Sequence, residues 1–587
     1  MATGLLALSA HAQPDPCTVG KWEAPFTHPL GPSCPSGGKP WPAVFNAGHM
    51  ALIPRRPHRG KVLVWDLEHY QNPSNPAIRS QRWAILDPTQ TPKVFLNNCL
   101  PLPNGKGDPF CAGQAWTRDG RLYVAGGTQD HGAVCPPNPS PPCAPAPLTG
   151  AKLTLLFDAT ATGNTNNMWT PGPDLKKGRW YPTVLAIDTQ PGTPPVDWML
   201  VFGGHDLPIQ PNSYEAYDPF TNTLDALGPF AGPLKGPGGF QWGLYVYPHM
   251  FLLVSPSTSF GQQFMGMMEY NGARVQHNAG PPRTWTNMPI GGVISQRQLN
   301  YGTSFLLPNP DPSDPVSNLY YQDVVVRVGG LDTLTGTPGN PTNLSQFCKA
   351  SASQAGAYPN GWDWTGAPAL QQMAHARYFP NAVILPDGTV LVIGGHSGTA
   401  QNLVPVLTPE RLVGGQWYPM ADMVSPRGEH SVAVLLPDGR VLVGGGEDRC
   451  CDYEIYKPPY LFCGTPPVIT NPPPGPSTPP IAVSYNQTAT VTYQDNLPLG
   501  IFVEKVVLIR PGAVTHGFNM DQRYLRLEIV DHTVGTMPPS TRAITFKAPP
   551  NSRHAPKGYY MLFLVTNPTG QGANQGTPSQ AAWVVLQ

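Results

Sequence analysis

One pattern recurs along most of the chain, a short run of Val, Leu and Ile that ends in two glycines. Several copies begin with Asp-Gly, a dipeptide typical of tight turns between antiparallel strands. The five clear copies are VDWMLVFGG ending at Gly204, DVVVRVGG at Gly330, DGRLYVAGG at Gly127, DGTVLVIGG at Gly395 and DGRVLVGGG at Gly446. Two weaker copies lack the glycines, RGKVLVW ending at Trp65 and YPHMFLLVS ending at Ser255.

Successive copies lie about 50 to 77 residues apart. Repetition of strands at such a period is the sequence signature of a propeller, and seven copies predict a seven-bladed kelch-like β-propeller. A chain of 587 residues is long for one ordinary domain, and a propeller keeps such a length in one body. The paired glycines would let neighbouring blades approach closely. We therefore assign residues 14–462 to the propeller and its N-terminal extension.

The C-terminal part has a different pattern. The stretch NPPPGPSTPP predicts an extended linker over residues 463–480, because proline cannot donate to a strand ladder. Residues 481–587 alternate apolar and polar side chains in six or seven short segments. This predicts an immunoglobulin-like β-sandwich, so the fold class is all-β throughout.

Composition limits the partners and the compartment. Only 12% of residues are charged, the formal net charge is zero and no basic run occurs, which argues against nucleic acid and anionic membranes. No apolar run is long enough for a membrane span. Residues 1–13 resemble the end of a secretory signal, which predicts a secreted, extracellular or periplasmic protein. The alternative is an ordinary N-terminus, since the positive n-region is missing.

Ten cysteines fit an oxidising compartment. The pairs Cys17/Cys34 and Cys135/Cys143 are spaced to close small loops, and the cluster at 450, 451 and 463 has room for another bridge. Spacing alone leaves the connectivity open.

Chemically reactive side chains stand in four separated motifs. They are Cys111 in FCAG, Tyr181 in GRWYP, the pair Glu429-His430 in PRGEH, and His516 in VTHGF. Two imidazoles, a phenol and a further oxygen donor suit a tetragonal Cu(II) site.

These motifs, together with VFNAGHMALIP, RQLNYGTSFLLP and the C-terminal APKGYYMLFLVTNPTGQG, resemble the copper radical oxidases, the glyoxal oxidase and galactose oxidase family. The resemblance implies one copper ion on the propeller axis, with His430 and His516 as imidazole ligands. It also implies that the sulfur of Cys111 is joined to the ring of Tyr181, which gives a tyrosyl radical ligand. A small aldehyde or primary alcohol would then lose two electrons, and O2 would leave as H2O2.

One position departs from the family. The family has Tyr followed by His in this blade, and this chain has Glu429 before His430. In the family the axial phenol is thought to accept the substrate's hydroxyl proton. The reference pKa of Glu is about 4.3 against about 10 for Tyr, so Glu429 is the weaker base. We expect altered or slower oxidation, or a more acidic substrate such as an aldehyde hydrate.

Structural alternatives accompany each assignment. Cys111 alone is typical of a buried thiol or half of a disulfide, and Glu429 alternatively pairs with Arg427 at the rim. A copper-binding relative without turnover and a kelch scaffold for adhesion or carbohydrate binding are rival functions, because propellers have many uses. Four histidines near the repeats are expected to be structural: His49, His249, His375 and His396.

Overall fold

The computed structural model describes most of the chain. The described residues are 15–28, 45–72, 75–102, 106–130, 149–162, 165–188, 197–204, 214–225, 234–235, 241–242, 247–253, 263–267, 273–278, 284–288, 299–308, 319, 324–332, 340–349, 372–399, 402–446, 452–532, 540–568 and 575–587. Strands dominate these residues, and the prediction of an all-β fold is confirmed. The helical segments among them are α1 (Pro16–Val19), η1 (Thr165–Met168) and η4 (Pro459–Leu461).

Antiparallel sheets follow one another along the chain from residue 47 to residue 457. The N-terminal sheets contain β3 (Ala47–Leu52), β4 (Val62–Asn72), β5 (Asn75–Asp87) and β6 (Val94–Leu102), and then β7 (Asp108–Trp116), β8 (Leu122–Asp130), β9 (Thr149–Gly150), β10 (Thr154–Phe157) and β11 (Trp169–Pro171). Next come β12 (Thr183–Asp188), β13 (Asp197–Phe202), β14 (Tyr214–Asp218) and β15 (Thr223–Asp225), and then β18 (Met250–Leu253), β19 (Gln263–Met267), β20 (Ala273–Asn278) and β21 (Thr284–Met288).

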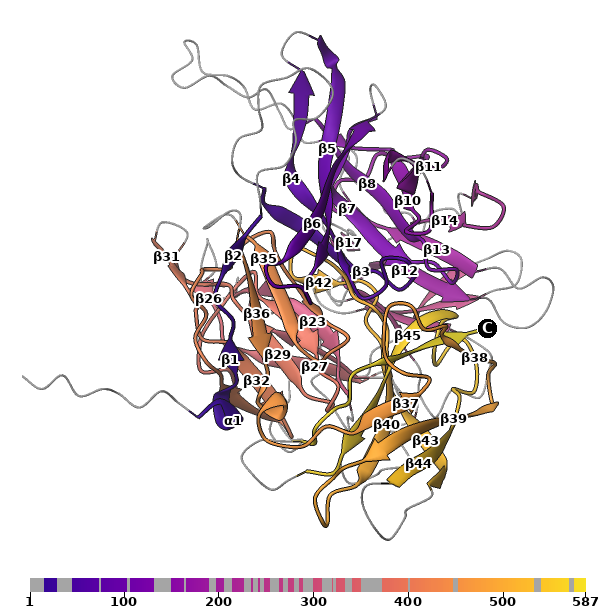
Figure 1. The fold of residues 1–587 in the computed structure, drawn as a ribbon. Helices are drawn as coiled ribbons and strands as arrows, with labels where there is room; N and C mark the ends of the chain where they lie inside the picture. The colour runs from indigo at the N-terminus through magenta and orange to yellow at the C-terminus, as the bar shows by residue number, and fades with distance from the viewer. Residues whose placement is uncertain are drawn as a thin grey trace, which may run out of the picture.

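The remaining sheets complete this series (Figure 1). They contain β23 (Thr303–Leu306), β24 (Val324–Val328) and β27 (Ser345–Lys349), then β28 (Asn381–Ile384), β29 (Val390–Ile393), β32 (Glu410–Val413) and β33 (Gln416–Pro419), then β34 (Ser431–Leu435), β35 (Val441–Gly445) and β36 (Asp452–Lys457). Smaller pairings involve β16 (Leu234–Lys235), β17 (Gln241–Trp242), β22 (Leu299–Asn300), β25 (Leu331–Asp332), β26 (Asn340–Pro341), β30 (His396–Thr399) and β31 (Asn402–Pro405).

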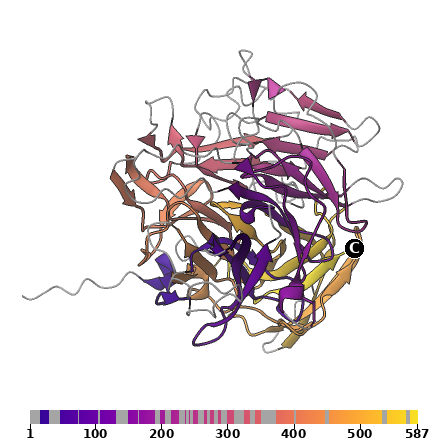
Figure 2. The same cartoon turned by 90° about the horizontal axis from the view of Figure 1, so that it is seen from above.

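The first strands of neighbouring sheets touch. β7 contacts β12, β12 contacts β18, β23 contacts β28, and β28 contacts β34. The last of these sheets returns to the first, because β34 also contacts β3. Figure 2 shows the magenta strands from the middle of the chain between the purple and the orange ones.

The N-terminal segment completes the last sheet. β1 (Lys21–Trp22) and β2 (Phe26–Thr27) pair antiparallel with β36, with Lys21 opposite Lys457 and Phe26 opposite Tyr453. A disulfide joins Cys17 in this segment to Cys463, which lies 446 residues further along the chain. The predicted Cys17/Cys34 loop is therefore wrong, because Cys17 is bonded across the molecule; Cys135 and Cys143 lie outside the described residues.

The glycine pairs join neighbouring sheets. Gly126 and Gly127 both have positive φ, and the Gly127 N–H donates to the carbonyl oxygen of Arg179 at 2.9 Å. A Cβ on Gly126 would lie 2.4 Å from that same oxygen, so only glycine fits. Two later pairs repeat the bond: Gly330 donates to Arg377 (2.8 Å) and Gly395 to Arg427 (2.6 Å). The sequence repeat thus marks where one sheet is bonded to the next.

One weak repeat was misassigned. RGKVLVW and the five glycine copies form second strands of their sheets, β4, β8, β13, β24, β29 and β35. YPHMFLLVS instead contains β18, the first strand of its sheet. The glycine pairs follow second strands, so a first strand such as β18 is not expected to carry one.

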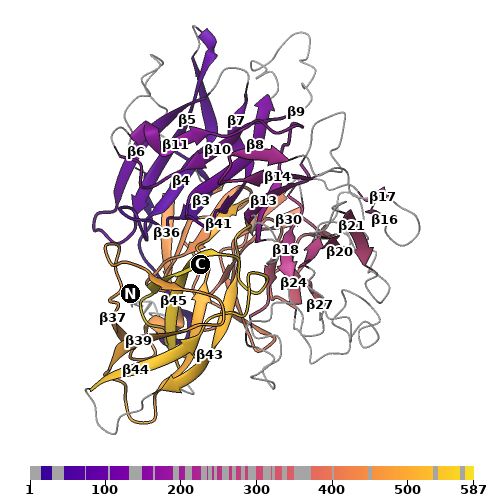
Figure 3. The ribbon, with the colours of Figure 1, turned by 90° about the vertical axis from the view of Figure 1, so that its right-hand side faces the viewer.

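The C-terminal strands build a separate layer with its own core (Figure 3). They are β37 (Val468–Asn471), β38 (Ile481–Val483), β39 (Thr488–Asp495), β40 (Val503–Ile509), β43 (Tyr524–His532), β44 (Ser540–Lys547), β45 (Gly558–Thr566) and β46 (Ala582–Leu586). β43 pairs with β40 through residues 524–527 and with β44 through residues 528–532, so the sheet folds over a core that includes Val491, Leu525 and Phe546. β37 lies inside the stretch predicted as a linker, because only the prolines after it exclude strand pairing.

Two C-terminal strands leave this layer. β41 (Ala513–Thr515) and β42 (Phe518–Asn519) form a hairpin that adds to the first sheet, with β41 paired to β3. Figure 3 shows β41 beside β3, away from the other C-terminal strands. The turn of this hairpin carries His516.

No helix among the described residues is long and apolar enough to cross a membrane.

Candidate metal centre

The four motif positions converge from four places in the fold. Cys111 lies on β7, Tyr181 precedes β12, His430 precedes β34, and His516 lies in the β41–β42 turn. All four have a left-handed backbone, with φ of 63°, 62°, 62° and 49°. Non-glycine residues rarely adopt this conformation, and it persists where the surrounding structure enforces it. Here it turns each side chain out of the strand pattern and towards a common point.

The backbone enforces it through bonds between sheets. The N–H of Tyr181 donates to the carbonyl oxygen of Cys111 at 3.0 Å, and that of Tyr247 donates to Tyr181 at 2.6 Å. The same bond joins Phe379 to Tyr301 at 2.7 Å, and all of these residues have positive φ. These bonds hold five of the left-handed residues, Cys111, Tyr181, Tyr247, Tyr301 and Phe379, against a neighbour in the next sheet.

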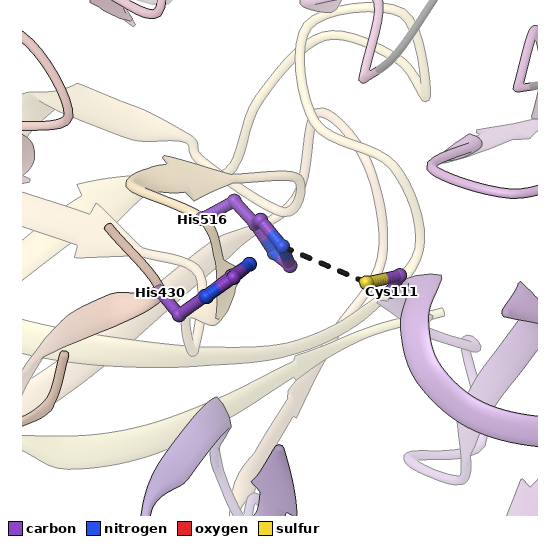
Figure 4. A group of neighbouring side chains, drawn as sticks. All are labelled: Cys111, His430 and His516. Atoms are coloured by element: carbon purple, nitrogen blue, oxygen red, sulfur yellow. Dashed lines mark hydrogen bonds between the residues drawn. The ribbon is translucent and has the colours of Figure 1, made fainter. Parts of the chain in front are cut away.

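The side chains meet at close range. The Sγ of Cys111 lies 3.8 Å from Nε2 of His516, and the Tyr181 hydroxyl lies 3.4 Å from Nε2 of His430. One ligand atom each of Cys111, His430 and His516 lies within 4.8 Å of the others. The two imidazole rings stand at 89° to each other with centroids 4.3 Å apart. Figure 4 shows the three side chains pointing toward one another.

The hydrogen bonds assign the tautomer of His516. The hydroxyl of Thr515 has one proton, which it donates to the carbonyl oxygen of Gly48 at 2.9 Å. It therefore accepts from Nδ1–H of His516 at 2.7 Å, and we assign the free lone pair to Nε2. Burial, followed by the nearby His430 and His49, lowers the pKa of His516 well below 6.5. A neutral imidazole with an oriented Nε2 is the form that binds a metal.

The side chains of Cys111 and Tyr181 are close enough for each to affect the pKa of the other. The sulfur therefore lies near the Tyr181 hydroxyl. Burial raises the pKa of the Cys111 thiol and of the Tyr181 hydroxyl well above their usual values. Among the described cysteines Cys111 is the free thiol, so the reading of it as half of a disulfide is wrong.

Glu429 lies at the edge of this group. One carboxylate oxygen is 3.9 Å from Nε2 of His430, and the side chain is 38% exposed against 9% for His430. The alternative expectation that Glu429 pairs with Arg427 is wrong. Arg427 is fully buried and is ion-paired instead with Asp452 (2.8 Å) and Glu454 (3.2 Å).

A buried arginine precedes three of the left-handed residues, Tyr181, Phe379 and His430. Arg179, two residues before Tyr181, has Nε 3.0 Å from Glu215 and donates from Nη1 to the Gly203 carbonyl at 2.6 Å. Glu215 also accepts the backbone N–H of Lys176 at 2.6 Å. Arg377 with Glu410 before Phe379, and Arg427 with Glu454 before His430, repeat this arrangement. The sequence gives no periodic signal for the glutamates.

A second ion pair fixes the His516 hairpin to the strand that carries Cys111. Arg510 and Asp521 are paired at 2.7 Å, and both are buried. Asp521 accepts the N–H of Trp116 at 2.7 Å, and Arg510 donates to the Trp116 carbonyl at 2.9 Å. Trp116 ends β7, so these bonds tie the hairpin to β7.

Two aromatic residues pack on the Tyr181 ring. Trp180 stacks on it at 4.0 Å and 18°, and Tyr247 stacks at 4.8 Å and 23°. Tyr247 is buried, and its hydroxyl donates to the carbonyl oxygen of Ala112 at 3.2 Å. Sequence reasoning missed Tyr247, because LYVYPH matches no motif; its place just before the first strand of a sheet was the available signal.

The donor set fits copper. Two neutral imidazole nitrogens and a phenol oxygen, with a carboxylate 3.9 Å from one imidazole, match the tetragonal N and O environment that Cu(II) prefers. His430, His516, Tyr181 and Glu429 are the residues that would hold it. The Cys111 sulfur lies beside these donors, 3.8 Å from Nε2 of His516.

Comparisons with known proteins agree with this chemistry. A family model described as "Galactose oxidase-like, Early set domain" matches residues 467–586. A galactose oxidase of Gibberella zeae is 25% identical over 554 residues, which cover 90% of this chain and 67% of that protein. The aldehyde oxidase GLOX1 of Arabidopsis thaliana is 31% identical over 242 residues, 37% of each chain.

A solved structure shares the fold. It is described as "Novel fungal alcohol oxidase with catalytic diversity among the AA5 family, in complex with copper", and it matches with a TM-score of 0.66 and 21% identity. The match covers 97% of this chain and 100% of that one. The relatives named galactose oxidase and aldehyde oxidase GLOX, together with the galactose oxidase-like family model, support the copper radical oxidase family for this chain.

Proposed function

We propose that this chain is a secreted mononuclear copper radical oxidase that oxidises a small aldehyde or primary alcohol. A primary alcohol and O2 would give an aldehyde and H2O2, and an aldehyde hydrate and O2 would give a carboxylic acid and H2O2. The observation that carries the proposal is the convergence of Tyr181, His430 and His516, with the Cys111 sulfur 3.8 Å from Nε2 of His516. In this proposal the sheets form a seven-bladed propeller over residues 14–462, preceded by a signal remnant at 1–13 and followed by an immunoglobulin-like sandwich at 481–587.

The roles follow from the chemistry of each group. Tyr181, Glu429, His430 and His516 bind copper, which supplies one-electron redox chemistry. The thioether between Cys111 and Tyr181 makes the phenol easier to oxidise, so it supplies the second electron equivalent. Buried, neutral imidazoles suit both oxidation states of the metal.

Glu429 accepts the proton of the substrate hydroxyl in this proposal. Its carboxylate is 38% exposed and lies 3.9 Å from Nε2 of His430, so it is accessible beside the centre. A carboxylate is a weaker base than a phenolate, so it favours a substrate with a more acidic O–H, such as an aldehyde hydrate. A carbohydrate with a free primary hydroxyl is a further candidate partner of this chain.

A peroxide assay tests the proposal. Copper-loaded wild type, Glu429→Tyr and Glu429→Gln are compared on a panel of primary alcohols and aldehydes. We expect wild type to prefer aldehydes, Glu429→Tyr to gain activity on alcohols, and Glu429→Gln to lose activity on both. Unchanged rates in both variants would show that Glu429 does not act on the substrate.

The position of Glu429 also favours a second candidate, a redox-silent copper protein. In that case the chain binds one copper ion but forms no radical absorption band and no peroxide on any substrate. Failure to bind copper at all would favour a kelch scaffold for adhesion or carbohydrate binding instead.

A further inference from the structure

His49 is a buried imidazole that the proposed chemistry does not use. It lies on β3 with no measurable exposure, and its ring stacks on Trp65 at 4.4 Å and 13°. The sequence predicts a structural role for it. Its two nitrogens, however, both point at groups connected to the metal centre.

The first contact is with the backbone of Cys111. The N–H of Cys111 donates to Nε2 of His49 at 3.2 Å. The β7–β8 pairing is irregular between Asp108 and Ala112, so the strand ladder leaves this N–H without its usual partner. Since the Cys111 carbonyl accepts from Tyr181, both of its backbone polar groups are fixed, one by His49 and one by Tyr181.

The second contact leads to the other side of the centre. Nε2 of His49 is an acceptor, so we assign the proton to Nδ1, which donates to Oε1 of Gln114 at 3.2 Å. The Gln114 amide nitrogen donates in turn to the Val514 carbonyl at 2.9 Å. Val514 lies two residues before His516, and His49 is opposite Thr515 in the β3–β41 register. One hydrogen-bonded path thus links the backbone of Cys111 to the hairpin of His516.

We propose that His49 is a positioning residue, which holds the left-handed backbone of Cys111 so that its sulfur faces the Tyr181 ring for coupling. The inference rests on the proposed function, since coupling is the step that it serves. In that step the thiol and a ring carbon each lose one hydrogen and a C–S bond forms. The two electrons and two protons pass to O2, which becomes H2O2.

The test uses three variants of the full chain. His49→Phe keeps a flat ring on Trp65 but offers no acceptor, and His49→Gln restores an acceptor for Cys111 and a donor for Gln114. His249→Phe is the matched control, because His249 is also buried and stacked on an aromatic ring, Phe518 at 4.1 Å, but is hydrogen-bonded to Ser304.

Two readouts are taken. In copper-free protein, amide hydrogen exchange reports the protection of the Cys111 N–H. After copper and air are added, mass spectrometry follows the linked Cys111–Tyr181 peptide with time. In His49→Phe we expect the Cys111 N–H to exchange at least tenfold faster than in wild type. We expect Cys111 and Tyr181 to couple at least tenfold more slowly. His49→Gln should lie near wild type in both, and His249→Phe should couple at the wild-type rate.

The outcomes separate the two proposals. Suppose that wild type couples Cys111 to Tyr181. If His49→Phe then couples equally fast, or if His249→Phe slows coupling as much as His49→Phe does, the proposed role of His49 is wrong and the oxidase proposal stands. If wild type never couples but exchange at Cys111 rises in His49→Phe, the oxidase proposal fails and the hold on Cys111 stands. If the exchange rate of the Cys111 N–H is unchanged in His49→Phe, His49 does not hold the Cys111 backbone, whether or not wild type couples.

Discussion

The pair Arg179–Glu215 lets the support of Tyr181 be tested separately from its chemistry. Both side chains are buried, and Glu215 Oε1 lies 3.0 Å from the Arg179 guanidinium. Glu215→Ala removes this partner and the acceptor of the Lys176 N–H, and leaves a buried charge uncompensated. Breaking such a pair costs about 3–5 kcal/mol, whereas the net contribution of an intact pair is smaller.

The expected change in Tm follows from the size of the chain. Unfolding entropy is about 2.1 cal/mol/K per residue, or about 1.2 kcal/mol/K for a chain of this length. The loss therefore lowers Tm by about 2–4 °C in cooperative unfolding, which scanning calorimetry resolves. Because Arg179 lies two residues before Tyr181, the same variant should couple Cys111 to Tyr181 several-fold more slowly.

Glu410→Ala is the matched control. Glu410 pairs with Arg377 at 2.6 Å in the same way, but that arginine precedes Phe379 rather than Tyr181. It should lower Tm by a similar amount and leave coupling unchanged. A Tm of Glu215→Ala within 1 °C of wild type (the change expected is about 2–4 °C) would refute the energetic argument. If Glu215→Ala and Glu410→Ala slow the coupling of Cys111 to Tyr181 equally, the Arg179–Glu215 pair has no specific role in supporting Tyr181.

Three further predictions concern stability. Cys463→Ser opens the bridge to Cys17 and should cost about 2–5 kcal/mol, seen as a lower urea midpoint that reduction of wild type reproduces; no difference between oxidised and reduced wild type would contradict it. Burial lowers the pKa of His249 to about 3 from 6.5, so its contribution to stability is present above pH 6.5 and is lost as the pH falls towards 3. The urea midpoint of His249→Phe should fall less steeply over that pH range than that of wild type, and parallel curves would disprove this. Gly394→Ala meets a carbonyl oxygen 2.4 Å away, whereas Gly414→Ala meets nothing within 4 Å, and both have positive φ. Thermal melts should show about 1–2 kcal/mol lost at Gly414 and clearly more at Gly394; equal losses would mean that the close approach is unimportant.

Much of the fold was predictable because strand repeats are local signals. The glycine pairs predict strands, which the structure shows to be second strands of their sheets, and Gly127, Gly330 and Gly395 bond to the next sheet. YPHMFLLVS was counted as a copy of the same repeat because an apolar run alone does not tell a first strand from a second. β37 was missed because the prolines that follow it dominate the local composition.

The candidate site was predictable in its members but not in its support. Family-like motifs named Cys111, Tyr181, His430 and His516, and the structure brings all four together. The contact of His49 with Cys111 joins residues 62 apart, and the bridge from Cys17 spans 446. Such pairings depend on how sheets are stacked, and no spacing in one sequence encodes them.

Peptide mass mapping of copper-loaded, air-exposed wild-type protein is the decisive measurement for the Cys111–Tyr181 thioether. We expect a linked peptide containing Cys111 and Tyr181, lighter by two hydrogen atoms than the separate peptides together. Complete copper loading with Cys111 recovered as a free thiol would contradict it.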